Sequence, residues 1–308
     1  MNWSLFWDLT VSGVTLGSVY ALIALGYSMV YGILKLLNFA HGDVYMIGAF
    51  VGYFALQGLG GPLHPSVAVW LVVTLMFLAG MLGGGLLGVA IERFAYRPLR
   101  DAPRIAPLIS ALGVSFFLQN SALLIFGASF RDYSTFNLIG ERTYHVGNVF
   151  LSVPQLLTIV SSLGLMVVLT LFVARTKIGK AMRATSFDRE AASMMGIDVD
   201  RVIASTFFIG SALAGAAGVM FGLVFGQIYH FMGFLAGLKG FTAAVIGGIG
   251  SIPGAMLGGL LVGLAESYAT GYLPQGSTFQ NLYVFGLLIL IILIRPSGIL
   301  GKAAVKKV

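Results

Sequence analysis

The sequence contains no cysteine and unusually few charged residues. Without cysteine, the 308-residue chain can form neither a disulfide framework nor a thiolate metal site. Only 9% of its residues are charged, whereas ordinary soluble domains carry about 25%. This leaves too little polar surface for a water-exposed body, which excludes an ordinary soluble enzyme. A disordered chain is excluded too, because it needs high charge and low hydrophobicity.

Familiar catalytic and nucleotide-binding motifs are absent as well. The sequence has no P-loop of the form GxxxxGK[ST], no HExxH zinc motif and no GxSxG elbow. The acids within or at the edge of apolar segments are few, namely Asp43, Glu92 and Glu266. This inventory is poor for an intramembrane enzyme and thin for an ion-coupled transporter. We therefore expect a non-catalytic chain with no metal or cofactor of its own.

Long apolar runs dominate the rest of the chain, in which 58% of residues are hydrophobic and 42 are glycine. A membrane helix needs about 20 mostly apolar residues. Nine segments approach this length: 11–34, 39–59, 67–91, 105–126, 153–174, 202–224, 231–249, 255–272 and 279–294. They predict an all-α polytopic membrane protein with eight or nine spans, in one transmembrane domain over residues 1–308. Nine crossings fit, and so do seven crossings with re-entrant half-helices.

Basic residues gather in three short stretches, 93–104, 175–201 and 295–307, whereas the first 34 residues contain no lysine or arginine. The positive-inside rule places all three stretches in the cytoplasm. The N-terminus is therefore predicted outside, the C-terminus inside, and residues 130–150 in an outside loop. The net charge of +7 then indicates topology and contact with anionic lipid, not nucleic acid.

Two segments rich in glycine and alanine, 13–31 and 210–226, open the two halves of the chain and would cross the membrane in opposite directions. An inverted repeat requires this arrangement. Shared low-complexity composition explains the likeness equally well, so the sequence leaves the repeat open.

The polar stretch 175–201 is predicted to contain a short amphipathic helix. Thr185-x-x-Asp188 has the form of a capping box, and Gly196 is a suitable helix stop. Between them fits a helix of about ten residues, with one apolar face formed by Phe187, Ala191, Met194 and Met195. This face suits either the lipid interface or the groove of a partner protein.

Five stretches of the sequence resemble one family of membrane proteins. They are 38–48 (NFAHGDVYMIG), 92–99 (ERFAYRPL), 190–196 (EAASMMG), 196–201 (GIDVDR) and 247–255 (GGIGSIPGA). In order and spacing they resemble the LivH-type permease subunits of branched-chain amino-acid ABC importers, over essentially the whole chain. The resemblance implies that 190–196 belongs to the EAA loop, whose coupling helix docks on an ATPase subunit. The implied coupling residues are Phe187, Glu190, Ala191, Ala192, Met194, Met195 and Gly196.

The same resemblance implies an assembly in a bacterial inner membrane. A LivM-like second permease subunit would pair with this chain, and two ATPase subunits, LivG- and LivF-like, would bind ATP and Mg below. An external binding protein would deliver leucine, isoleucine or valine. Members of the family also carry urea, short amides or other small amino acids. A stand-alone secondary transporter is the rival from another class.

Several polar residues are candidates for the translocation path, each with a structural alternative. Asn38, His41 and Asp43 start the second apolar segment, where they would either cap a helix at the cytoplasmic interface or face a ligand. Gln119 and Asn120 would either hydrogen-bond another helix or line the path.

Two further features lie in the last third of the chain. Glu266 is deep in an apolar context, so it must pair, protonate or face a polar cavity, and Lys239 is a suitable partner. The glycine-rich stretch between the last segments is predicted to be a flexible hinge or re-entrant turn; it contains Gly247, Gly248, Gly250, Pro253 and Gly254.

Overall fold

The computed structural model describes residues 3–59, 69–100, 102–103, 105–133, 143–146 and 149–301. The helices are α1 (Trp3–Leu34), α2 (His41–Gly58), α3 (Val69–Ile91), α4 (Ile105–Phe126), α6 (Val153–Arg175), α7 (Lys177–Phe187), α8 (Arg189–Met194), α9 (Val199–Phe225), α10 (Met232–Gly247), α11 (Ile252–Tyr272) and α12 (Gly276–Ile294). A π turn (Glu92–Tyr96) and a 3-10 turn (Arg97–Leu99) extend α3. The short strands are β1 (Arg131–Asp132), β2 (Thr143–Val146), β3 (Val149–Ser152) and β4 (Gln227–Ile228).

Each of the nine predicted apolar segments forms a helix, which confirms the all-α polytopic fold. Within the described residues, seven helices are long and apolar enough to cross a membrane. The two apolar helices outside that set are α2, which carries His41 and Asp43, and α10, which has 16 residues. Their first turns meet inside the protein, where a Cβ at Gly42 would lie 2.3 Å from the Gly233 carbonyl oxygen.

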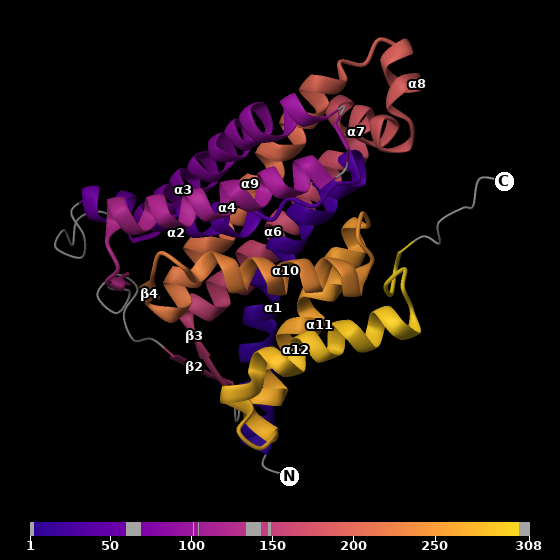
Figure 1. Cartoon of the computed structure of the whole chain (residues 1–308). Helices are drawn as coiled ribbons and strands as arrows, with labels where there is room; N and C mark the ends of the chain where they lie inside the picture. Colours follow the sequence, from indigo (N-terminus) through magenta and orange to yellow (C-terminus); the bar gives the residue numbers. More distant parts are fainter. Residues whose placement is uncertain are drawn as a thin grey trace.

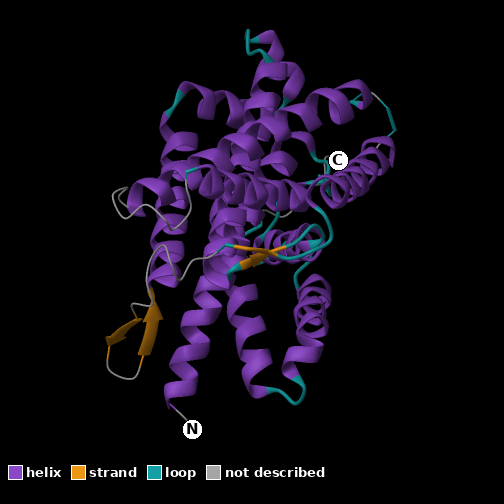
Figure 2. Ribbon diagram, turned by 90° about the vertical axis from the view of Figure 1, so that its left-hand side faces the viewer, coloured by secondary structure: helices purple, strands orange, loops and turns teal. Residues whose placement is uncertain are grey.

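In Figure 1 the strands lie toward the lower left of the helix bundle and the short helices α7 and α8 at its upper right; Figure 2 shows the two pairs of strands in orange. β2 pairs with β3 in an antiparallel hairpin, and β1 pairs with β4. β1, β2 and β3 fall in or beside the stretch 130–150, which is predicted to be outside, and β4 pairs with β1. α7 and α8, predicted to be cytoplasmic, project from the other end (Figure 1). The fold therefore separates the two groups of loops as the basic residues require.

The packing of the two halves follows one pattern. The first half of the chain contains the consecutive helices α1, α2 and α3, and the second half contains the corresponding helices α9, α10 and α11. α1 packs against α9, α10 and α11, whereas α9 packs against α1, α2 and α3. Arg189, which shortly precedes α9, contacts Ile33 at the end of α1, so α1 and α9 run in opposite directions. This exchange of partners favours the inverted repeat over compositional similarity.

Glycine allows these helices to approach at backbone distance. Gly80, Gly84 and Gly88 on α3 face the α9 stretch that contains Gly215. A Cβ at Gly215 would lie 2.1 Å from the Gly80 carbonyl oxygen, closer than real Cβ contacts permit. Such small-residue interfaces suit a membrane, where burial of apolar side chains provides little drive for helix association.

The outer helices differ from this centre. α4, α6 and α12 bury few of their residues, and many of their apolar side chains are exposed, among them Leu124, Val168 and Leu293. By contrast, α1 and α9 are largely buried. The structure thus has a small-residue centre and an apolar rim suited to contact with lipid.

Replacing Gly215 by valine is expected to destabilise the protein by at least about 1–3 kcal/mol, the usual cost of overpacking a tight interface. Thermal unfolding in detergent, followed by size-exclusion chromatography, measures the effect. Gly113→Val in α4 is the matched control, because a Cβ at Gly113 meets nothing within 4 Å. Equal loss in both variants would contradict a role for close packing at Gly215.

Candidate functional site

Two short helices, α7 and α8, form the predicted cytoplasmic segment, and each has its own cap. Thr176 accepts the Gly179 amide at the start of α7, and Asp188 accepts the Ala191 amide at 3.0 Å at the start of α8. Gly196 has a φ of +81° and ends the segment, as expected. These caps fix the ends of α8 although its six residues could not form a stable helix in isolation.

The prediction of one helix starting at Thr185 is wrong. Thr185 is buried in the last turn of α7, and its side chain does not cap α8. Asp188 takes the cap instead, because its extended backbone (φ −153°) ends α7 and points its carboxylate at the next amides. Phe187 therefore closes α7, while Glu190 lies in α8.

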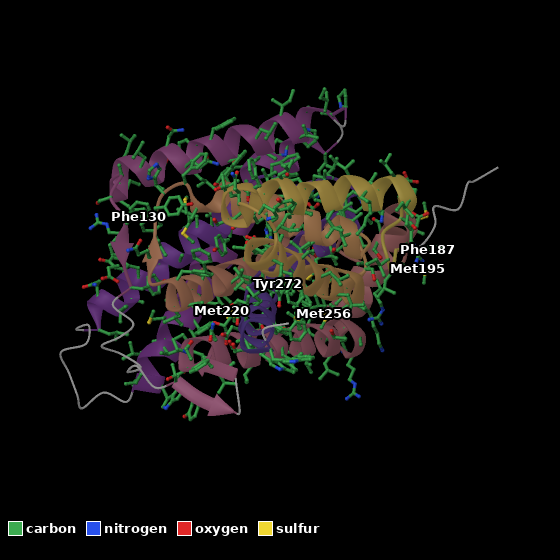
Figure 3. All side chains as sticks on the ribbon, turned by 90° about the horizontal axis from the view of Figure 1, so that it is seen from below. Phe130, Phe187, Met195, Met220, Met256 and Tyr272 are labelled. Carbon is green, nitrogen blue, oxygen red and sulfur yellow. The ribbon has the colours of Figure 1, made fainter. Side chains whose placement is uncertain are left out.

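Six of the seven predicted coupling residues are exposed, and Ala192 is the exception. Phe187, Met194 and Met195 have exposed fractions of 95%, 86% and 83%. Ala191 and Glu190 are exposed beside them, whereas Ala192 is buried and anchors α8. Figure 3 shows Phe187 and Met195 together at one end of the molecule, with Phe130 at the other. We call Phe187, Glu190, Ala191, Met194 and Met195 the coupling surface.

A shallow hollow of about 400 Å³ adjoins the coupling surface. It is lined by Arg189, Glu190, Ser193, Met194 and Val199. Phe187, Met194 and Met195 protrude beside this hollow, so a partner protein with a complementary groove can bind here. Methionine is well suited to such a contact because its unbranched side chain adapts to the partner.

The start of α2 is buried in the protein and has no side-chain cap, so the prediction that these residues cap the helix is wrong. Asn38, His41 and Asp43 are each 1% exposed. Ala40 precedes the helix, and no side chain caps it. Hydropathy could not locate this break, because α2 begins beside the last third of α1: the His41 ring lies against Gly26 and packs edge-on at 4.8 Å from the Tyr27 ring.

Asp43 joins α2 to α4. Its carboxylate accepts hydrogen bonds from the Ser115 hydroxyl and from Gln119 Nε2, the latter at 3.0 Å. This confirms the interhelical bond expected for Gln119. The same expectation for Asn120 is wrong, because its side chain is exposed and donates to the Phe116 carbonyl of its own helix.

Lys239 and Glu266 form the predicted buried pair. Lys239 Nζ lies 2.6 Å from Glu266 Oε1, and the Tyr20 hydroxyl donates to Glu266 Oε2 at 3.0 Å. Both charged residues are buried, so each compensates for the other's loss of water. The cluster ties α1, α10 and α11 together.

The glycine-rich turn between α10 and α11, predicted to be a flexible hinge or a re-entrant turn, is closely packed. Gly247 lies so close to Gly254 that a Cβ at Gly247 would meet the Gly254 carbonyl oxygen at 1.8 Å. Gly248 and Gly250 have positive φ, and Pro253 occupies the first turn of α11. The C-terminal segment covers the turn with backbone hydrogen bonds from Ile299 to Ile246 and from Leu300 to Gly247, both at 2.9 Å.

Sequence reasoning missed two connections at the predicted cytoplasmic end. Arg97 and Arg100 both pair with Asp200, and Arg100 also pairs with the buried Glu92. These pairs join the end of α3 to the start of α9. Arg189 reaches across to the backbone at the end of α1. No local pattern in the sequence predicts either connection, because each joins distant segments.

A family described as the permease component of branched-chain amino acid transport systems matches residues 9–294. The chain belongs to this permease family. It is therefore a multi-pass membrane protein of a transport system, and seven of its described helices are long and apolar enough to be membrane spans.

The permease resembles named relatives along nearly its whole length. It is 46% identical over 302 residues to the high-affinity branched-chain amino acid permease protein BraD of Pseudomonas aeruginosa, covering 97% of this chain and 96% of BraD. It is 45% identical over 303 residues to LivH of Salmonella typhimurium, covering 96% of each. LivM of Escherichia coli is 26% identical over 319 residues, covering 94% of this chain and 70% of LivM.

Neutralising one member of the Lys239–Glu266 pair is expected to cost about 3–5 kcal/mol, because it leaves the other charge buried without a partner. Lys239→Met and Glu266→Gln should each reduce the yield of folded permease, and the double variant should recover most of it. Fluorescence-detected size-exclusion chromatography measures the three yields. A double variant worse than both single variants would contradict the pairing.

Proposed function

We propose that this permease is a translocation subunit of an ATP-driven ABC importer for branched-chain amino acids, and that the coupling surface docks on an ATPase subunit. The observation that carries the proposal is the exposure of Phe187, Met194 and Met195 together at one end of the bundle. An exposed apolar cluster on capped helices is a feature of a protein contact. Identity of 46% and 45% to BraD and LivH supports the cargo.

The proposed assembly supplies what this chain lacks. ATP and Mg belong to two LivG- and LivF-like ATPase subunits, because the sequence has no P-loop. A LivM-like subunit pairs with this permease in the membrane, and an external binding protein delivers leucine, isoleucine or valine. The permease itself catalyses no reaction.

In this assembly α7 and α8 face the cytoplasm, the N-terminus and the β2–β3 hairpin face outside, and the C-terminus is inside. Nine crossings then connect the loops consistently. The break between α1 and α2 lies between the two sides and is proposed to line or gate the path. It carries the buried Asn38, His41 and Asp43, and Gln119 bonds to it. The Lys239–Glu266 pair is proposed to have the same role. Asn120, on the outer face of α4, is the weakest path candidate.

Transport by the whole complex tests the proposal. The permease is co-purified with its neighbouring permease and ATPase gene products, and ATP hydrolysis is measured with and without a leucine-loaded binding protein. Phe187→Ala and Glu190→Lys are expected to reduce the leucine-dependent stimulation at least tenfold, because each alters the coupling surface. Phe94→Ala is the matched control, since Phe94 is also strongly exposed (80%) but lies outside that surface.

Wild-type stimulation and leucine uptake in both coupling variants would contradict the docking role. If the complex hydrolyses ATP in response to urea or a short amide and not to leucine, the proposal of an ATP-driven importer stands and the proposed substrate is wrong. Uptake by the permease alone in vesicles would replace the proposal with a secondary transporter.

A further inference from the structure

The end of α1 carries a side-chain contact that the proposed mechanism does not yet use. The last carbonyls of a helix have no partner within the helix. α1 ends where Lys35 takes a positive φ of 56°. The Ile33 carbonyl receives two hydrogen bonds from Arg189, from Nε at 3.0 Å and from a terminal guanidinium nitrogen at 2.6 Å. The guanidinium thus caps α1 from 156 residues away.

Arg189 is the first residue of α8 and is adjacent to Glu190 in the coupling surface. Its backbone follows the Asp188 cap, so its position is fixed with that of the helix. Because both donors bind one backbone carbonyl, the contact depends on the path of the main chain and not on a neighbouring side chain. Any displacement of α8 therefore acts directly on the last turn of α1.

The contact holds against unfavourable charge. Burial lowers the pKa of Lys35, and the nearby positive charge of Arg189 lowers it further. Burial likewise lowers the pKa of Arg189, with Arg100 contributing in the same direction. Repulsion from two cations would drive an arginine into water, so the carbonyl bonds and the helix dipole are what retain it.

The chain after Ile33 leads straight to the buried start of α2. Residues 35–40 connect the two helices, and the Tyr96 hydroxyl donates to the Leu37 carbonyl at 2.9 Å. That hydroxyl also lies 3.3 Å from Asn38 Oδ1. Hydrogen bonds therefore hold the chain on both sides of Lys35: Arg189 binds the Ile33 carbonyl before it, and Tyr96 binds the Leu37 carbonyl after it.

We propose that Arg189 is a positioning residue that transmits movement of the coupling surface to the break between α1 and α2, through its hydrogen bonds to the Ile33 carbonyl. This inference rests on the proposed function, because it assumes that α8 moves with an ATPase subunit. The coupling surface receives the movement, and the Arg189–Ile33 contact delivers it to the polar residues in the membrane.

Arg189→Met tests the inference in the assembled complex, since methionine keeps the aliphatic volume and removes the donors. The variant is expected to assemble and to hydrolyse ATP within twofold of wild type, while leucine transported per ATP falls at least tenfold. Arg189→Lys, which keeps the charge and one donor group, should restore part of that ratio. Arg201→Met is the matched control, because Arg201 is 88% exposed at its side chain and pairs only locally with Asp198.

A distance measurement makes the test independent of cargo and of stability. The chain has no cysteine, so Lys35→Cys and Ser193→Cys can carry spin labels in a complex with cysteine-free partner subunits. With Arg189 present, one narrow distance distribution is expected in both the nucleotide-free and the ATP-bound state. With Arg189→Met, the distribution should broaden or shift when ATP binds.

An unchanged distribution and an unchanged transport ratio in Arg189→Met would overturn the inference. If Glu190→Lys still uncouples the complex in that case, the proposed function stands and only the role of Arg189 fails. If Glu190→Lys also transports normally, the docking role of α8 has failed, and with it the basis of the inference.

Discussion

Close approach at glycine, where a Cβ would collide with a neighbouring helix, is the constraint on which the rest of this structure depends. A Cβ at Gly26 would lie 2.2 Å from His41 Nε2, and one at Gly215 would lie 2.1 Å from the Gly80 carbonyl oxygen. Because lipid is as apolar as leucine, such packing has to replace the hydrophobic drive that holds soluble cores together. The space left by Gly26 is also what admits the start of α2 into the protein. The polar break therefore exists where it does because the adjoining helix carries no side chain there.

Buried polar groups reinforce the contacts that glycine permits. Asp43 bonds α2 to α4 through Gln119, and Glu266 bonds α11 to α10 and α1 through Lys239 and Tyr20. Each cluster attaches a more peripheral helix to the centre, and each satisfies a carboxylate that could not otherwise remain in an apolar bilayer. The predicted cytoplasmic end adds charged pairs and caps to apolar packing, in which Met182 of α7 joins the hydrophobic core and Ala192 of α8 is buried.

The sequence predicted these features unequally, for physical reasons. Nine apolar runs located nine helices, and the cost of an isolated buried charge identified Lys239 as the partner of Glu266. Depth was not predictable, because hydropathy cannot distinguish a polar residue at an interface from one inserted beside Gly26. The prediction that Thr185 caps the short helix failed because Asp188, three residues later, is an equally suitable capping residue. Glycine content indicated flexibility at Gly248, yet backbone bonds from Ile299 and Leu300 close that turn.

The central claim is that the coupling surface and the β2–β3 hairpin lie on opposite sides of the membrane, with the coupling surface in the cytoplasm. Single cysteines at Ser193 in α8 and Tyr144 in β2, introduced into this cysteine-free chain, can be labelled with a membrane-impermeant maleimide. In intact spheroplasts the account predicts labelling at position 144 and none at 193, and the reverse in inside-out vesicles. Labelling of both positions from the same side, or of position 193 from outside, would contradict it.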